Sequence, residues 1–473
     1  MLPLLLATLL VPAQQPNIVL INADDLGIND LGCYGRTDHA TPHLDRLASE
    51  GMRFTSAYCG QPICSPSRAA LLTGKHAARL HLTTYLPGRA DAPSQKLLHP
   101  RIRQQLPREE ITLAEYLRRA GYATACIGKW HLGGKGAGPA DFGFTTVFAA
   151  KANTTPSATE GGKGEYELTR RAEQFLSDHR DRPFFLYLAH NNPHIPLAAR
   201  DELIKKHAKA FHPLYAAVIE TLDDSVGQLL RKLDELKLRE RTIVLFTSDN
   251  GGLHVPELRD HAPTHNTPFR AGKGFLYEGG LRIPLIVRFP GVVRPGTVQH
   301  TPVLQTDLVP TLLELVGRDI PTGLDGISFA GLLRGKELPA RSLYWHFPHY
   351  NNQGGRPGGA VRQGDWKLVH HYDTNRSELY HLGEDPGEKD DRAAREPARV
   401  RQMLADLVAW RKQIGAQENT PNPDFDPALY RQLYEDVDVS KLRPARTAAE
   451  MTPGLQRWRQ LMDRVVSGKK ATR

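Results

Sequence analysis

The chain has 473 residues, 40% of them hydrophobic, so it is long enough for a large core and too long for one ordinary compact domain. Its four cysteines are too few for a disulfide scaffold. The formal net charge is +9, but nine basic and two acidic residues between Lys441 and Arg473 supply +7 of it, so the charge does not indicate a nucleic-acid-binding protein.

The N-terminus has features of an export signal. Leu4–Val11 is a short apolar run, and Val11-Pro12-Ala13 resembles a signal-peptidase cleavage site. We therefore expect a signal peptide over residues 1–15 and a periplasmic or secreted protein, although the positive charges that usually precede such a run are missing. The alternative is an apolar leader to the first strand. We expect no stable insertion into a membrane, because no apolar stretch is long enough.

Apolar runs and helical periods alternate over residues 16–338. In chain order, the patterns predict a strand at Asn17–Asn22, helices from Thr41 to Gly51, Ser65 to Thr73 and Leu113 to Ala120, strands at Ala123–Ile127 and Phe184–Ala189, a helix from Leu214 to Leu236, and strands at Ile243–Ser248 and Leu285–Arg288. This alternation indicates an α/β domain whose mostly parallel sheet is covered by helices on both faces. In such sheets, ligands bind beyond the carboxyl ends of the strands.

The pattern changes in the last third of the chain. The segments SLYWHF, DWKLVHH and SELYHL predict short antiparallel strands, and a helix is predicted from about Glu396 to Gln413. We therefore expect a small α+β subdomain over residues 339–416. Residues 417–473 are rich in Pro, Asn, Asp and Arg, which predicts an irregular basic tail.

Acidic and amide side chains follow two of the predicted strands. Asp24 and Asp25 come after the first strand, and Asp249 and Asn250 follow the strand that ends at Ser248. Each pair alone is more typical of a turn or a helix cap. Together they would bring three carboxylates and an amide to one edge of the sheet, which indicates calcium or magnesium rather than zinc.

Basic side chains gather in the same way after other strands. Lys129 and His131 follow the strand at Ala123–Ile127, His194 follows the strand at Phe184–Ala189, and Lys273 precedes the last predicted strand. Alone, each is typical of a surface charge or a structural histidine. Facing a cation site, they describe a pocket for an anion, in which lysines bind its oxygens and histidines transfer protons.

Cys64 opens the segment Cys64-Ser-Pro-Ser-Arg68 at the start of a predicted helix. A helix N-terminus lowers the pKa of a thiol, so the simplest interpretation is a reactive cysteine. Thiol nucleophiles suit acyl transfer, however, and a thiolate is a poor companion for a cation held by hard oxygen ligands. The arrangement is better explained if Cys64 is converted to an oxygen nucleophile.

These residues resemble the type I sulfatases of the alkaline-phosphatase-like superfamily. Cys64–Arg68 fits the family's Cys-x-Pro-Ser-Arg sequence without departure. The resemblance continues, in order, through Asp24-Asp25, GKWHLG at Gly128–Gly133, Pro183–Pro196, Ser248–Gly252, Gly272–Pro284, DWKLVHH and ELYHLGEDPGE. It covers nearly the whole chain to about Asp391.

The resemblance implies a fold and a chemistry. The fold would be an alkaline-phosphatase-like α/β/α sandwich with a small C-terminal antiparallel sheet and a helix. A formylglycine-generating enzyme would oxidise Cys64 to formylglycine, and one Ca²⁺ ion would be bound by Asp24, Asp25, Asp249, Asn250 and the modified Cys64. Arg68 would hold the formylglycine hydrate, and Lys129 and Lys273 would bind the sulfate oxygens. His194, with Lys273, would protonate the leaving group, and His131 would serve the second half-reaction.

The expected function is hydrolysis of sulfate esters of carbohydrates or of aryl sulfates. One alternative is a phosphatase or phosphodiesterase of the same superfamily, and another is a catalytically silent protein that binds sulfated glycans. Candidate sugar-contacting residues are Trp345, His346, Tyr350 and the loop His81–Arg89. His190 has no assigned role, and a further sulfate contact cannot be placed within Gly143–Gly164.

Overall fold

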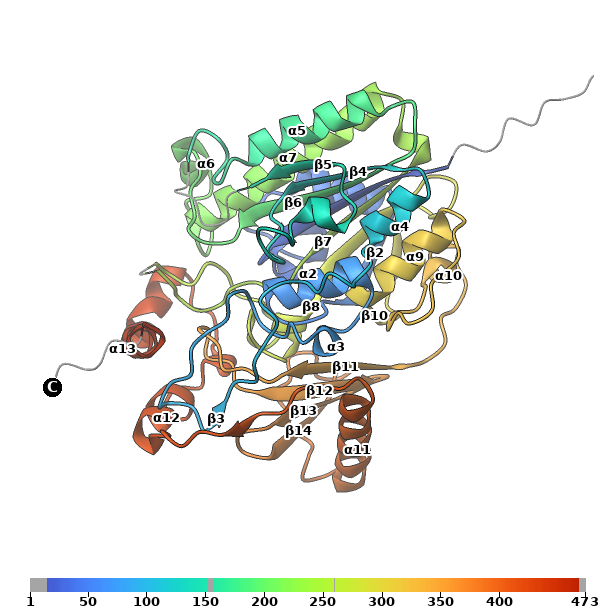
Figure 1. Ribbon diagram of the computed structural model, residues 1–473. Coiled ribbons are helices and arrows are strands. Elements are labelled where there is room, and N and C mark those ends of the chain that lie inside the picture. Colours follow the sequence, from blue (N-terminus) through green and yellow to red (C-terminus); the bar gives the residue numbers. More distant parts are fainter. Residues whose placement is uncertain (1–14, 151–156, 259, 468–473) are drawn as a thin grey trace, which may run out of the picture.

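Two main sheets organise the chain in the computed structural model, which describes residues 15–150, 157–258 and 260–467 (Figure 1). Residues 1–14 of the predicted signal peptide lie outside the described residues. In spatial order, the large sheet contains β10 (Val303–Leu304), β2 (Met52–Tyr58), β8 (Arg282–Arg288), β7 (Thr242–Ser248), β1 (Asn17–Asp24), β6 (Phe184–Pro193), β4 (Ala123–Gly128) and β5 (Thr146–Ala149), and β9 (Thr297–Gln299) pairs with β2.

The large sheet is mostly parallel, as the sequence predicts. Strands β7, β1, β6, β4 and β5 run parallel to one another, whereas β8 is antiparallel to both β7 and β2. Every residue of β1, β6 and β7 is buried. This burial on both faces explains why these strands are continuous apolar runs rather than alternating patterns.

Helices cover both faces of the large sheet (Figure 1). Helices α1 (Pro42–Ser49), α5 (Glu165–Asp178) and α7 (Pro213–Glu235) lie on one face, and α2 (Cys64–Thr73), α4 (Leu113–Arg119) and α9 (Leu308–Leu315) lie on the other. Strand β1 divides its side chains between two cores, because successive residues of a strand point to opposite faces. Val19 and Ile21 join the core under α7, whereas Ile18 and Leu20 join the core under α2.

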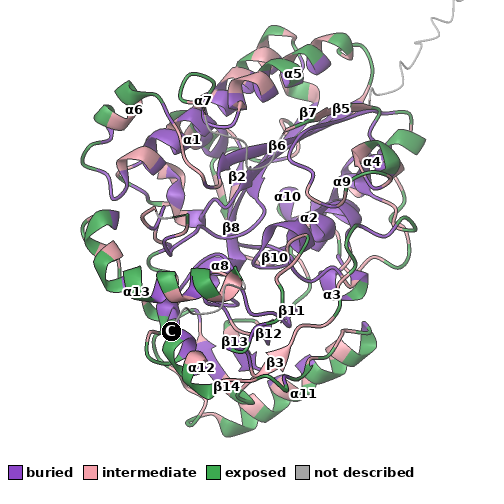
Figure 2. Ribbon diagram, turned by 60° about the vertical axis from the view of Figure 1, so that its left-hand side comes forward, coloured by how far each residue is buried: buried purple, intermediate pink, exposed green. Residues whose placement is uncertain are grey.

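The small sheet is an antiparallel meander with a helix on it, as expected. Its strands are β11 (Ser342–Phe347), β12 (Gly358–Gln363), β13 (Trp366–His371) and β14 (Arg376–His381). Helix α11 (Pro397–Gln413) buries Met403 and Leu407 against Val361, Leu368 and Leu379 of this sheet. The outer face of α11 is exposed, whereas the central strands of the large sheet are buried (Figure 2).

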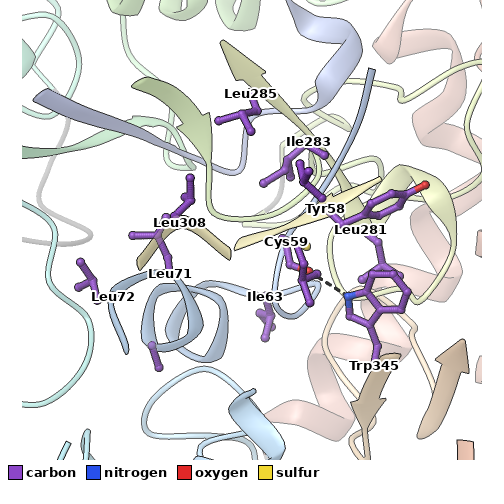
Figure 3. Close-up of a cluster of buried hydrophobic side chains, with 14 of the residues drawn as sticks. Tyr58, Cys59, Ile63, Leu71, Leu72, Leu281, Ile283, Leu285, Leu308 and Trp345 are labelled. Atoms are coloured by element: carbon purple, nitrogen blue, oxygen red, sulfur yellow. Dashed lines mark hydrogen bonds between the residues drawn. The ribbon is translucent and has the colours of Figure 1, made fainter. Parts of the chain in front are cut away.

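The two sheets share a hydrophobic core around Trp345 of β11 (Figure 3). The Trp345 indole N–H donates a hydrogen bond of 2.9 Å to the carbonyl oxygen of Cys59. Trp345 and Tyr350 are each 1% exposed, and His346 is fully buried. The prediction that these three residues contact a sugar is therefore wrong, because Trp345 and Tyr350 pack in the core and the buried His346 ring is hydrogen-bonded to Tyr372 and Gln417.

The C-terminal segment contains helices where an irregular tail was expected. Helix α12 (Pro427–Tyr434) begins after Asp426, whose side chain accepts backbone N–H groups of its first turn. Helix α13 (Ala448–Val466) buries Leu455, Trp458 and Met462 on one side. This apolar stripe has helical spacing, but many charged residues separate its members, so the composition misled the prediction.

The remaining elements are short. They are α3 (Ala77–Leu80), α6 (Asp201–Lys206), α8 (Glu278–Leu281), α10 (Ala330–Leu333) and a strand pair formed by β3 (Leu97–Leu98) and β15 (Thr420–Pro421). Within the described residues, no helix combines the length and the apolar character needed to cross a membrane.

Candidate active site

The carboxyl ends of β1 and β7 bring the predicted acidic residues together. Asp24 is the last residue of β1, and Asp249 and Asn250 follow β7 directly. The Asp25 backbone N–H donates to Asp249 Oδ1 at 3.0 Å, and Asn250 Nδ2 donates to Asp25 Oδ1 at 2.9 Å. Asp25 has a φ of 65°, a backbone conformation that non-glycine residues rarely adopt outside functional sites.

Cys64 and His194 complete a cluster that could hold a metal ion. Ligand atoms of Asp24, Asp25, Cys64 and His194 all lie within 4.8 Å of one another. Asp24 Oδ1 and Asn250 Oδ1 are buried and accept no hydrogen bond. Buried oxygens without a donor are costly, and hard oxygen ligands are those that calcium prefers, so the residues present fit such an ion.

Three buried cations surround the carboxylates. Lys129 Nζ lies 2.6 Å from Asp24 Oδ2, Lys273 Nζ lies 2.6 Å from Asp25 Oδ2, and Arg68 Nε donates to Asp249 Oδ2 at 2.9 Å. Burial opposes the charged forms, but Lys129 holds the pKa of Asp24 well below its usual value, and Asp25 raises the pKa of Lys273. Such pairing is what makes buried charges tolerable.

Helix α2 positions both Cys64 and Arg68. Cys64 is its first residue, and Arg68, one turn later, is fully buried and donates to the carbonyl oxygen of Lys129 at 3.0 Å. Burial raises the pKa of Cys64 to about 12, although Lys129 and Lys273 favour the thiolate. The expected lowering of this pKa by the helix N-terminus is therefore wrong, because loss of solvent outweighs it.

A hydrogen bond to the loop His81–Arg89 fixes the tautomer of His131. Its Nε2 lies 3.1 Å from the carbonyl oxygen of Leu86, and the Leu86 N–H donates to Ser65 Oγ at 3.1 Å. A carbonyl oxygen only accepts, so Nε2 carries the proton of the neutral ring. Nδ1 is then left with a free lone pair, and it is buried without a partner. Burial lowers the pKa of His131 to about 3, which keeps the ring neutral.

Gly128 allows Lys129 to approach β6. Its φ is 115°, and a Cβ at this position would lie 1.9 Å from the carbonyl oxygen of Ala189. The Lys129 N–H donates to that same oxygen at 2.8 Å. Only glycine permits this contact, which orients the Lys129 side chain toward Asp24.

The loop that carries His194 is anchored by Glu165, a residue that sequence reasoning missed. Glu165 Oε1 accepts the backbone N–H groups of Asn191 and Asn192 at 3.1 and 3.0 Å, and Oε2 lies 2.5 Å from His190 Nδ1. Both His190 and Glu165 are fully buried. His190 therefore supports the loop, and only the tertiary contact distinguishes Glu165 from an ordinary acidic residue at the start of a helix.

Lys163 is a second missed residue, and it lies within the stretch where a further contact could not be placed. Its Nζ donates to the carbonyl oxygen of Ile195 at 2.7 Å and lies 3.5 Å from His194 Nδ1. Burial lowers the pKa of Lys163 to about 8. Its signal in the sequence, one lysine between glycines, is too weak to find without the fold.

A pocket of about 540 Å³ opens above Cys64. Its lining residues are Ile63, Cys64, Tyr85, Leu86, Pro87, His131, His194, Ile195, Pro196, Glu257, Leu258, Lys273, Asn352 and Gln353. All the predicted catalytic residues either line this pocket or pair with the carboxylates at its floor. The loop His81–Arg89, for which a sugar contact was predicted, contributes Tyr85, Leu86 and Pro87 to the lining of this pocket.

Comparison with known proteins identifies the family. The family model "Sulfatase" matches residues 16–318, and the model "N-sulphoglucosamine sulphohydrolase, C-terminal" matches residues 271–413. The chain belongs to the sulfatase family. This sulfatase is 36% identical to human arylsulfatase A over 81% of its own length and 85% of that protein. It is 29% identical to the N-acetylgalactosamine-6-O-sulfatase of Bacteroides thetaiotaomicron over 83% and 92% of the two chains.

Solved structures agree with this assignment. The crystal structure of Ps i-CgsB matches with a TM-score of 0.74 and 28% identity, over 84% of the sulfatase and 93% of that chain. The phosphonate monoester hydrolase of Agrobacterium radiobacter matches with a TM-score of 0.63 at 20% identity, over 85% and 96% of the two chains, and shows the common fold alone. The fold is thus alkaline-phosphatase-like, and the protein is a sulfuric ester hydrolase of the type I sulfatase family.

Proposed function

We propose that this sulfatase hydrolyses sulfate monoesters of carbohydrates through a formylglycine made from Cys64 and one bound calcium ion. The observation that carries the proposal is the position of Cys64, which clusters with Asp24, Asp25 and His194 and lines the same pocket as Lys273. A buried, neutral thiol is a poor nucleophile, whereas an oxygen nucleophile at this position suits a hard cation and an anionic substrate.

Asp24, Asp25, Asp249 and Asn250, with an oxygen of the modified Cys64, would hold the calcium ion. When bound, calcium stabilises negative charge on oxygen, as Lewis-acid metal ions do. Lys129 and Lys273, which pair with Asp24 and Asp25, would bind the sulfate oxygens. Arg68 holds the nucleophile in place and adds positive charge beside the transferring group.

The remaining side chains move protons. The hydrate of formylglycine has two hydroxyl groups on one carbon, so one can accept the sulfuryl group and the other can help to expel it. His131 Nδ1, with its free lone pair, accepts the proton of the second hydroxyl. His194, with Lys273 beside it, protonates the leaving oxygen, and Asp25 keeps Lys273 charged at neutral pH by raising its pKa.

Sulfated sugars are the substrate class that the relatives suggest. One relative is an N-acetylgalactosamine-6-O-sulfatase, and Ps i-CgsB has been solved in complex with k-i-k-neocarrahexaose. We infer a periplasmic or secreted location, where such polysaccharides occur, and maturation by a formylglycine-generating enzyme before or during export. This location also agrees with the apolar N-terminal segment.

Peptide mass spectrometry of Cys64, combined with sulfate-release assays, tests the proposal. The substrates are an aryl sulfate, a panel of sulfated sugars and an aryl phosphate, each with and without a calcium chelator. We expect the aldehyde at Cys64 and sulfate release that stops when calcium is removed. A fully modified protein that releases phosphate and never sulfate would overturn the proposal, as would full activity of a protein with unmodified Cys64.

A further inference from the structure

The wall of the pocket above the catalytic floor differs sharply from the floor in charge. The floor holds Lys273, His131 and His194 around Cys64. Glu257 is the one acidic side chain among the described residues that line this pocket. If the scissile sulfate sits among these cations, Glu257 is available to the leaving group, which is the part of the substrate that carries the sulfate.

Gln353 holds the Glu257 carboxylate in position. Gln353 Nε2 donates to Glu257 Oε1 at 2.5 Å, and Gln353 is only 4% exposed. The side-chain oxygen of Gln353, Oε1, is buried and has no hydrogen-bond partner, and the same is true of Asn352 Oδ1. Buried acceptors without donors are costly, so a ligand whose hydroxyl or amide N–H groups reach these oxygens would be favoured.

This wall is rigid. The Gln353 N–H donates to Asn351 Oδ1 at 3.0 Å, and Asn351 Nδ2 donates to the carbonyl oxygen of Gly274 at 2.6 Å, next to Lys273. From the C-terminal helix α13, Arg459 donates to the carbonyl oxygen of Asn352 at 2.7 Å. Polar groups fixed in this way can discriminate between ligands, because they cannot move to satisfy a poorly matched one.

We propose that Glu257, with Gln353 and Asn352, forms a leaving-group subsite that selects an uncharged, hydroxyl-bearing sugar ring and rejects rings with a second anionic group beside the scissile sulfate. The proposal rests on the sulfatase function proposed above and names its substrate class. A carboxylate accepts hydroxyl or acetamido N–H groups, whereas a second sulfate or a carboxylate on the ring would meet like charge in a buried place. Leu86, Pro87, Ile195 and Pro196 give the apolar surface that the C–H face of a sugar requires.

The test compares wild type with Glu257→Gln at mildly alkaline pH. The substrates are an aryl sulfate, singly sulfated neutral hexoses and N-acetylhexosamines, and the same rings with a second sulfate or a uronate carboxylate. Sugars that are not turned over are measured as competitive inhibitors of aryl sulfate hydrolysis. We expect wild type to prefer the singly sulfated rings by about tenfold or more, and Glu257→Gln to reduce this preference by about tenfold. The aryl sulfate, which lacks hydroxyl groups, should keep its kcat/KM.

Two further variants keep the test decisive. Glu240→Gln, at an exposed site, should behave as wild type throughout. Asn352→Ala, at a half-exposed site that tolerates truncation, should lower kcat/KM for neutral sugars and leave the aryl sulfate unchanged even if Glu257→Gln fails to fold. Equal handling of singly and doubly charged rings by wild type, or a parallel loss on sugars and aryl sulfate in Glu257→Gln, would overturn the subsite while leaving the sulfatase function intact. A wild type that releases no sulfate even from the aryl sulfate would overturn the underlying function instead.

Discussion

At the residue scale, the surroundings of Cys64 explain why an unmodified cysteine is unsuited to this site. Burial keeps its thiol protonated, with a pKa of about 12, and its sulfur lies 3.8 Å from Asp25 Oδ1. A thiolate here would meet three carboxylates and compete poorly for a hard cation. The same position serves an oxygen nucleophile well, because calcium and the lysines would favour its deprotonated form.

Cys64→Ser should abolish turnover while leaving a single chemical step possible. A serine has one hydroxyl group, so it can accept a sulfuryl group but cannot expel it. We expect steady-state sulfate release to fall by about a thousandfold or more, a loss comparable to removal of a catalytic nucleophile. Intact mass spectrometry after incubation with substrate should show one added sulfuryl group.

Two cysteine variants control this experiment. Cys64→Ala should be inactive and should acquire no added mass. Cys33→Ser, which changes a half-buried cysteine remote from the predicted site, should retain activity. Repeated turnovers by Cys64→Ser would contradict the need for a second hydroxyl group.

Glu165→Gln should loosen the His194 loop. The carboxylate binds two backbone N–H groups and the His190 ring, and an amide cannot accept all three hydrogen bonds in the same geometry. We expect a fall in kcat of about 10- to 100-fold, as for other supporting residues of active sites, and a loss of about 1–3 kcal/mol in the free energy of unfolding. Steady-state kinetics and urea unfolding measure the two effects. Glu167→Gln on the same helix should change neither, and equal results for the two variants would refute the anchoring role.

At the element scale, the small sheet is joined to the large one by a buried charge network. Lys367 of β13 lies 2.9 Å from Glu278 Oε1 of α8 and 2.8 Å from Glu388 Oε1, and the three side chains are fully buried. Burial opposes ionisation of Glu278, but Lys367 and Arg282 hold its pKa well below the usual value. Two motifs that lie far apart in the sequence are thus joined by one ion pair, between Lys367 of DWKLVHH and Glu278 of YEGGLR.

Lys367→Met should destabilise the protein strongly. It leaves the buried Glu388 without its cation and removes one of the two cations beside Glu278. Such a change typically costs about 3–5 kcal/mol of unfolding free energy. Urea unfolding measures the loss, and Lys389→Met, at the exposed lysine that follows Glu388 in the sequence, should stay within about 0.5 kcal/mol of wild type. Similar stabilities of the two variants would show that the network contributes little.

At the scale of the whole molecule, the C-terminal segment supports the mouth of the pocket. Arg459 of α13 binds the backbone of Asn352, and Thr452 Oγ1 of the same helix lies 2.7 Å from His261 Nδ1. His254 Nε2 lies 3.1 Å from the carbonyl oxygen of Val439. The segment that was expected to be an irregular tail therefore supports residues around the pocket.

The contact between His254 and the C-terminal segment should stabilise the protein less at acidic pH. Burial lowers the pKa of His254 to about 4, because a proton on its buried Nδ1 would find no acceptor. The folded pKa lies below the unfolded value near 6.5, so the stabilisation is present above pH 6.5 and is lost as the pH falls toward 4. This one residue should lower the free energy of unfolding by on the order of 2 kcal/mol between pH 7 and pH 5.

Urea unfolding at the two pH values measures the effect. His254→Gln should reduce the loss, whereas His300→Gln, at an exposed site, should show the same pH dependence as wild type. An unchanged pH dependence in His254→Gln would assign the acid sensitivity to other groups.

Calcium should stabilise the whole molecule, because its proposed ligands come from segments at the ends of β1 and β7 and from the start of α2. Binding to the folded state alone adds about 2.7 kcal/mol at a free concentration of 100 Kd. We expect a chelator to lower Tm and added calcium to restore it, with a smaller response in Asn250→Ala. A Tm that is insensitive to both additions would argue against a tightly bound ion.

The sequence by itself determined the parallel sheet, the helices on its faces and the small antiparallel sheet, because periodicity and apolar runs report burial directly. It also placed Asp24, Asp249 and Lys129 at one edge, since parallel strands share the position of their carboxyl ends. The family resemblance carried by Cys64–Arg68 then pointed to the chemistry.

Only the tertiary structure decided the supporting and selecting residues. Glu165, Lys163 and Glu257 look like ordinary surface charges in the sequence, and Trp345 looks like a sugar platform until its burial is seen. The helices of the C-terminal segment were missed for the same reason. Burial of a polar group, or of a sparse apolar stripe among charges, depends on which distant segments pack against it, and no local pattern records those partners.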